Sequence, residues 1–230
     1  MFKSRIVTLL FTSGLFTSGL VTSGLVTSAN LAAAGTWEVA RQNEDITAYT
    51  QYSETLGYNA VKFETVVDVS VETLVSFNTE PENFNQWMES FDQVEILKRD
   101  TWYDYHLYVT YDFPFPYQNR DSISHTSLFR KNDGTVIVKF VGEEEGKPLN
   151  EDYVRMDYIQ GAWEFIPLEE NKTKIVYTSL VSPGGDGPKW VINAFSLDVP
   201  FASLENLIES MKTYQPRSIS MDEIPLEKDS

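Results

Sequence analysis

The sequence has no cysteine and only two histidines among its 230 residues. Without a thiol, disulfide bonds, cysteine nucleophiles and thiolate metal sites are all excluded. The two imidazoles, His106 and His125, lie 19 residues apart, so a zinc or non-haem iron site would need carboxylates for its other ligands. We therefore expect both histidines to be ordinary structural or surface residues, and we predict no metal and no cofactor.

Basic residues are also scarce. Lysine and arginine number 18 against 34 aspartates and glutamates, which gives a formal net charge of -16 at pH 7. Such a surface repels phosphate backbones and anionic headgroups at long range. Nucleic acid is therefore not an expected partner, and unassisted binding to an anionic bilayer is disfavoured. An excess of acidic residues of this kind typically serves to keep a protein soluble.

The N-terminal segment contains only two charged residues before Glu38, Lys3 and Arg5. An apolar run built from a repeated five-residue unit (FTSGL, VTSGL) follows them, and Ala32 and Ala34 offer a small-residue cleavage site. These features predict a signal peptide over residues 1–34 and a periplasmic or secreted protein. Loss of the two basic residues would take the net charge from -16 to -18. An uncleaved membrane anchor is the alternative, because the run exceeds the roughly 20 residues that span a bilayer.

The rest of the chain predicts one domain over residues 35–215, followed by a disordered tail over 216–230. After Ser70 the apolar spacing becomes helical, which predicts two short helices with Ser70 as N-cap and Pro81 opening the second. Gly161 predicts a bulge or a bend within its strand. Elsewhere apolar and polar residues alternate, which predicts strands over 46–53, 59–70, 93–100, 101–113, 120–131, 135–142, 153–168 and 173–181.

A stiff corner separates two of these strands. Pro114 and Pro116 lack backbone donors and hold the chain extended, so they end one strand before the next begins. Arg120 and Asp121 restart the sheet, either as a surface ion pair or as ligand contacts. Arg155 lies inside a strand, and we expect an acidic partner for it.

The last predicted element is a helix of about 25 residues that begins near Pro188. A glycine-rich turn precedes it as a hinge, and Pro200 is expected to kink it. One apolar stripe comprises Trp190, Leu197, Phe201, Leu204, Ile208 and Met211, and a second comprises Ile192, Phe195, Val199 and Ala202. We expect Trp87, Trp163 and Trp190 to pack in the core. Together the elements predict an α+β fold in which a curved antiparallel sheet wraps a long C-terminal helix, with two short helices inserted after the second strand.

Four stretches resemble the START lipid-transfer domains of the helix-grip (Bet v 1-like) group, and the resemblance covers residues 37–214. They are NFNQWM in the helical insertion, YDFPFPYQNRDSI at the corner, YVRMDYIQGAWEFIPL in a strand and VSPGGDGPKWVINAF before the last helix. The resemblance implies a deep apolar tunnel between sheet and helix that holds one sterol, phospholipid or other isoprenoid or acyl lipid. It also implies a monomeric lipid carrier or sensor without enzymatic activity, which docks transiently on a membrane or a protein. Together with the predicted signal peptide, this indicates a bacterial, exported member of the family.

The same resemblance implies which residues face the ligand. In the sterol-binding branch an acid and an arginine lie in the cavity, and this chain has Leu107 and Thr126 at the corresponding positions. A polar end of the ligand would then have to be met by Ser124, Thr126, Tyr105 or His125. The predicted lipid-binding residues are Tyr105, Leu107, Val109, Ser124, Thr126, Leu128, Met156, Phe201, Ser203, Leu204, Leu207 and Met211.

Two other functions remain open at this point. The helix-grip architecture also hosts polyketide aromatases and cyclases, for which His106 or His125 would have to lie in the cavity beside an acid or a hydroxyl group. Alternatively, the cavity is collapsed and the domain is an interaction module. Export favours the lipid carrier, because cyclase substrates are made on cytoplasmic carriers.

Overall fold

The computed structural model describes residues 36–185 and 187–228, so the predicted signal peptide or anchor lies outside the described residues. The strands are β1 (Glu38–Gln42), β2 (Ile46–Ser53), β3 (Tyr58–Val67), β4 (Phe91–Thr101), β5 (Asp104–Tyr111), β6 (Asn119–Arg130), β7 (Val136–Gly142), β8 (Tyr153–Arg155), β9 (Tyr158–Glu169) and β10 (Lys172–Ser182). The helices are α1 (Val71–Asn78), α2 (Phe84–Trp87) and α3 (Lys189–Met211), with the 3-10 turns η1 (Pro81–Asn83) and η2 (Met221–Glu223).

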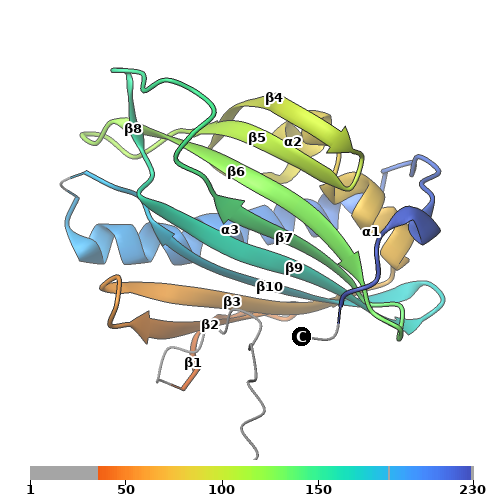
Figure 1. Cartoon of the computed structure of the whole chain (residues 1–230). Helices are drawn as coiled ribbons and strands as arrows, with labels where there is room; N and C mark the ends of the chain where they lie inside the picture. The colour runs from red at the N-terminus through yellow and green to blue at the C-terminus, as the bar shows by residue number, and fades with distance from the viewer. Residues whose placement is uncertain (1–35, 186, 229–230) are drawn as a thin grey trace, which may run out of the picture. The chain divides into compact units, whose positions relative to one another are not determined.

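The strands form one curved sheet in the order β1-β2-β3-β10-β9-β7-β6-β5-β4, and all neighbours in this order are antiparallel. Strand β8 lies beside β6 and is parallel to it. The sheet curves round α3, which contacts β2, β3 and α2 (Figure 1). The predicted α+β helix-grip arrangement is therefore confirmed.

The helical insertion between β3 and β4 begins as predicted. The hydroxyl group of Ser70 accepts a hydrogen bond from the backbone N–H of Thr73, which caps α1. Pro81 then opens η1, where its missing N–H costs nothing because the first turn of a helix has no carbonyl partner for it. The insertion places α2 against α3, so it helps to hold the C-terminal helix over the sheet.

The sheet differs from the prediction in three places. Residues Glu38–Gln42, for which no strand was predicted, form β1, which is paired with β2. The predicted strand over 153–168 is two strands, because β8 pairs with β6 before the chain turns into β9. Gly161 marks no bulge, since the register of β9 runs on through it toward both neighbours. A Cβ there would lie 2.3 Å from the Phe140 ring, so glycine is needed for this close approach.

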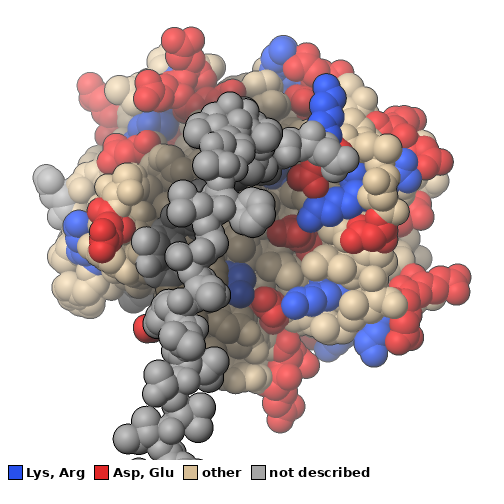
Figure 2. All heavy atoms as spheres, turned by 60° about the horizontal axis from the view of Figure 1, so that its bottom comes forward, with Lys and Arg blue, Asp and Glu red and all other residues tan. Residues whose placement is uncertain are grey.

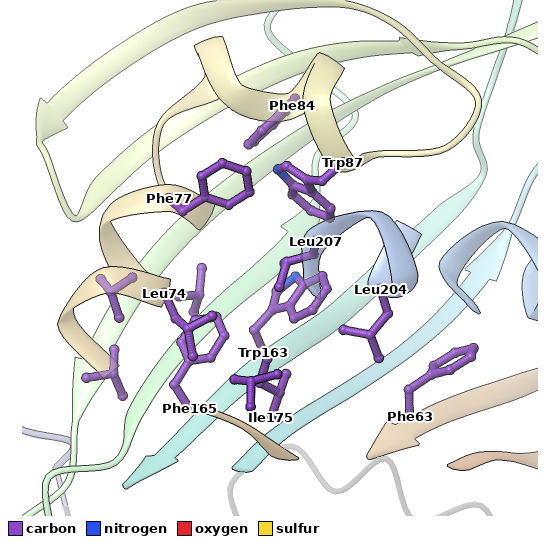
Figure 3. Close-up of a cluster of buried hydrophobic side chains, with 14 of the residues drawn as sticks. Phe63, Leu74, Phe77, Phe84, Trp87, Trp163, Phe165, Ile175, Leu204 and Leu207 are labelled. Carbon is purple, nitrogen blue, oxygen red and sulfur yellow. The ribbon is translucent and has the colours of Figure 1, made fainter. Parts of the chain in front are cut away.

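The main hydrophobic core lies between the sheet, α1, α2 and the second half of α3. Leu204 and Leu207 of α3 are fully buried and lie beside Trp163 and Ile175 of the sheet (Figure 3). Phe77 of α1 belongs to the same cluster. These contacts anchor the C-terminal half of the helix on the strands.

The predicted disordered tail over 216–230 is wrong for the residues that the structure describes. Ile224 is 1% exposed and belongs to the core. Leu226 forms a parallel bridge with Arg130 at the end of β6, and the indole N–H of Trp102 donates to Glu223 at 2.8 Å. One buried isoleucine and a few backbone hydrogen bonds are enough to fix a segment whose composition alone indicates disorder.

The surface is acidic without one dominant acidic patch on the face in Figure 2, where aspartates and glutamates are scattered among fewer lysines and arginines. Among the helices of residues 36–185 and 187–228, none has both the length and the apolarity to cross a membrane.

Candidate functional site

A cavity lies under the first half of α3. It holds about 1270 Å³ of empty space, counting the part open to solvent, and its wall is mostly apolar. Its wall is formed by one face of β5, β6, β7, β9 and β10, by the end of α2 and by α3 up to Ser203. The enclosed part amounts to about 200 Å³, which is below the roughly 300–1,000 Å³ of typical small-ligand pockets, so a whole lipid would fit only if part of it lies in the region open to solvent or if the wall moves outward.

Strand alternation places the predicted strand residues in this wall. Tyr105, Leu107 and Val109 of β5 line the cavity, and so do Ser124 and Thr126, which face Leu107 and Tyr105 across the β5–β6 pair. Side chains two apart on a strand share a face, so one buried member predicts the next. Met156, in the turn between β8 and β9, also lines the cavity.

The helix residues are placed differently from the prediction. Of the predicted helix positions, only Ser203 lines the cavity. Its hydroxyl group donates to the Val199 carbonyl at 2.8 Å and accepts from the Glu89 backbone N–H at 2.9 Å. The remaining predicted residues lie in or against the core and outside the cavity wall. They are Leu128, Phe201, Leu204, Leu207 and Met211.

The second apolar stripe of α3 supplies the wall instead. Ile192, Phe195 and Val199 line the cavity, and the ring centroid of Phe195 lies 4.3 Å from that of Phe113, two residues after β5. Both stripes have helical spacing, so spacing alone did not show which one would face the cavity. Position alone does not separate the stripes either, because Trp190 and Leu197 of the first stripe precede Pro200 as these three residues do.

Several other wall residues were missed. Trp87 and Trp163 were expected in the core, and both also line the cavity, with their ring centroids 5.5 Å apart. Trp190 was expected in the core and is 75% exposed. Further lining residues are Asn78, Phe84, Met88, Tyr111, Val138, Phe140, Ile159, Tyr177, Ser179, Val181, Pro183, Ser196 and Pro200.

The polar groups of the wall are uncharged apart from Glu89, which is exposed. Burial raises the pKa of the Tyr177 phenol to about 12 and also raises the pKa values of Tyr105 and Tyr111. All three phenols are therefore neutral at physiological pH and can donate a hydrogen bond. Such a wall favours a neutral, largely apolar guest.

One donor in the wall has no partner. Trp87 is 5% exposed, and its indole Nε1 makes no hydrogen bond to any of the described residues. A buried N–H without an acceptor costs roughly 1–3 kcal/mol. An oxygen atom of a bound molecule would satisfy it, so Trp87 is a candidate contact for a polar group of the ligand.

Arg120 is buried where the cavity meets the glycine-rich turn before α3. Its Nε donates to the Pro183 carbonyl at 2.9 Å and its Nη2 to the Gly184 carbonyl at 3.2 Å. Asp121 is also buried and accepts two hydrogen bonds from Arg155, at 2.8 and 3.0 Å. The prediction of an acidic partner for Arg155 is therefore confirmed, whereas a surface ion pair between Arg120 and Asp121 is wrong. Arg120 instead holds the turn from which α3 begins.

The two histidines lie outside the cavity wall. His106 and His125 alternate with the cavity-lining residues of β5 and β6, so their side chains are on the opposite face of the sheet. A cyclase mechanism that moves protons with a histidine in the cavity therefore has no such group here.

Comparison with known proteins gives one consistent result. The model of the START domain family matches residues 24–204. An uncharacterised protein of Pseudomonas aeruginosa is 25% identical over 182 residues, which are 78% of this chain and 88% of that protein. The crystal structure of a STAR-related lipid transfer protein fragment from Xanthomonas axonopodis superposes with a TM-score of 0.71 at 25% identity, covering 77% of this chain and 99% of the fragment.

Two further structures share the fold at lower sequence identity. Human STARD10 has a TM-score of 0.70 at 22% identity, covering 80% of this chain and 76% of that chain. The Zhui aromatase/cyclase of Streptomyces has a TM-score of 0.52 at 12% identity, covering 66% of this chain and 93% of that one. At these identities the similarity shows the fold alone, which serves both lipid transfer and cyclisation.

Proposed function

Because the chain belongs to the START domain family, we propose that it binds a single hydrophobic, lipid-like molecule in the cavity beneath the first half of α3. The observation that carries the proposal is the apolar wall of the cavity, in which the polar groups are neutral apart from one exposed carboxylate. Transfer of a lipid tail from water into such a wall contributes about 0.8 kcal/mol per buried CH₂ group. Binding therefore needs apolar area more than specific chemistry.

The neutral polar groups favour a particular kind of lipid. Trp87, Tyr105 and Tyr177 offer hydrogen-bond donors inside the cavity, and Ser124 and Thr126 offer hydroxyl groups. A hydroxyl, ester or other neutral oxygen would match these donors, whereas a buried phosphate would lack a cationic partner in the wall. The proposed ligand is thus a sterol-like or other isoprenoid or acyl lipid whose buried part is uncharged, and a phospholipid would have to keep its headgroup at the opening.

We further propose that the protein works after export, in the periplasm or outside the cell, as a carrier or sensor. The basic start, apolar run and small-residue site of residues 1–34 support this location. Release of the ligand would require the first half of α3 to move away from the sheet. The turn before α3 suits a hinge, because Gly184 and Gly185 have positive φ angles of 67° and 69° that other residues rarely adopt.

Native mass spectrometry of the protein purified from its own host tests the proposal. The expected result is a mass excess of one lipid per chain, which organic extraction then identifies. A Thr126→Trp variant is the control, because a large ring in the wall should reduce the loaded fraction while the protein stays folded.

The other outcomes separate the competing functions. Protein that is empty and takes up neither a fluorescent fatty acid nor a fluorescent sterol would contradict the proposal and favour an interaction module. An extracted molecule that the protein converts into a cyclised product on incubation would favour the aromatase or cyclase function, which shares the fold.

A further inference from the structure

A compact group of metal-binding side chains lies on the outer face of the sheet, away from the cavity. Strand pairing places His106 of β5 directly opposite His125 of β6, and their rings stack with centroids 4.5 Å apart. Asp104 lies two residues before His106 on the same face of β5. One ligand atom from each of Asp104, His106 and His125 lies within 4.8 Å of the other two.

Hydrogen bonds orient both imidazoles of this group, and the one between His106 and Glu143 leaves a ring nitrogen of His106 free. His125 Nε2 lies 2.8 Å from Asp104 Oδ1, and His106 Nδ1 lies 2.7 Å from Glu143 Oε2. Since Glu143 accepts from Nδ1, the Nε2 atom of His106 is left for an ion. A carboxylate that orients a histidine through its second nitrogen is the usual support of a metal-bound imidazole.

From this arrangement we propose a binding site for a divalent transition-metal ion of the zinc class. Its ligands are Asp104, His106 and His125, and Glu143 is the positioning residue for His106. Two imidazoles and a carboxylate suit borderline ions such as Zn²⁺, whereas Mg²⁺ and Ca²⁺ prefer oxygen ligands alone. Neighbouring ligands of a tetrahedral zinc ion lie roughly 3.4 Å apart, so small side-chain rotations close the present group around the ion.

The surrounding charges favour a cation. Asp100, Asp104 and Glu143 carry three negative charges near the histidines, and Lys98, which pairs with His106 across β4 and β5, carries one positive charge. The sum, -3 + 1 = -2, is the charge of this group with neutral imidazoles. Lys98 is engaged by Asp100 at 2.7 Å, which keeps its ammonium group on a carboxylate outside the ligand set.

The side chains of the three proposed ligands and of Glu143 are partly exposed, and their backbone is fixed by strand pairing. Between 22% and 37% of each side chain of Asp104, His106, His125 and Glu143 is exposed. An ion can therefore enter from solvent, while the strand pairing fixes the backbone on both sides. A bound ion would tie β5 to β6, whose inward residues Tyr105 and Thr126 line the cavity, and so would stabilise that wall by mass action.

The test is titration of the chelator-treated full chain with ZnCl₂ in isothermal titration calorimetry, with excess Mg²⁺ present. We expect one Zn²⁺ per chain. His106→Gln or His125→Gln should weaken affinity about 100-fold or more, and Glu143→Gln about tenfold. Asp68→Asn, which removes an exposed carboxylate outside the group, should leave affinity unchanged.

Histidine-selective ¹⁵N labelling gives a second readout that is specific to the site, because the chain contains only two histidines. In the wild type, Zn²⁺ should shift the ring-nitrogen signals of both histidines. In the Asp104→Asn variant, equimolar Zn²⁺ should no longer saturate the site, while the backbone signals remain those of a folded protein. The proposal is overturned if both rings are unaffected by Zn²⁺, or if binding survives in the double variant His106→Gln/His125→Gln. Neither result bears on whether the cavity holds a lipid.

Discussion

The two halves of α3 are built from similar residues and have different tasks. After Pro200 the helix is packed into the core, with Phe201, Leu204 and Leu207 almost fully buried. Before Pro200 it covers the cavity with Ile192, Phe195 and Val199, and Trp190 projects into solvent. One half therefore stabilises the fold, and the other leaves room for a guest.

Pro200 is the boundary for a physical reason. A proline inside a helix removes the hydrogen bond to the carbonyl four residues earlier, here that of Ser196, and its ring crowds that carbonyl. The two halves can therefore change their relative angle at less cost than an unbroken helix. Ser203, one turn further on, fastens the buried half to the loop after α2 through the Glu89 backbone. The half with the cavity is attached through the turn that Arg120 holds. It is also attached through the Asn193 side chain, which accepts from the Asn59 backbone N–H at 3.0 Å, and through Asp198, which pairs with Arg41 at 3.2 Å.

The largest effect should come from the buried half. Leu204→Ala removes a fully buried side chain among Trp163, Ile175 and their neighbours, and we expect the free energy of unfolding to fall by about 2–5 kcal/mol. Urea unfolding followed by tryptophan fluorescence measures this loss. The folded fraction should still bind lipid with nearly unchanged affinity, because Leu204 is outside the cavity wall. If Leu204→Ala instead weakened lipid affinity tenfold without changing the free energy of unfolding, the buried half of α3 would contribute to ligand binding and the division of tasks would be wrong.

An intermediate effect on stability, with a large effect on binding, is expected in the cavity half. Val199→Trp fills part of the empty space, so its cost in stability should stay within about 1 kcal/mol, below the usual 1–3 kcal/mol of overpacking. The lipid-loaded fraction seen by native mass spectrometry should fall at least about tenfold, a difference of roughly 1.4 kcal/mol in binding. Val199→Ile is the matched control, because it adds little volume. Normal loading of the tryptophan variant would argue that the ligand lies elsewhere.

The strand residues of the site could be predicted because side chains alternate along a strand, so each one faces either the cavity or the opposite side of the sheet. Once Tyr105 is assigned to the inner face, Leu107 and Val109 follow, and the antiparallel partner contributes Ser124 and Thr126. The fold could be predicted for the same reason, since alternating segments, one capped helical insertion and one long terminal helix allow few arrangements. Strand β8 was missed because parallel pairing with β6 depends on tertiary contacts.

The helix residues could not be predicted in this way. Helical spacing shows which faces of α3 are apolar, but a core and a cavity wall are both apolar, so Phe201 and Val199 look alike in sequence. The pairing of His106 with His125 depends on the register of β5 and β6, which composition does not contain. Ile224 was assigned to a disordered tail because one buried contact outweighs the local composition.

The smallest effect is expected at the exposed end of the cavity half. Trp190 belongs to the same apolar stripe as Leu204 in sequence, but it is 75% exposed at the start of α3. Trp190→Ala should therefore change the free energy of unfolding by no more than about 0.5 kcal/mol, in the same urea measurement that detects Leu204→Ala. Lipid loading should also be unchanged, because Trp190 is not part of the cavity wall. A loss above 2 kcal/mol, as for a core leucine, would mean that Trp190 packs against the protein and that the stripe is continuous after all.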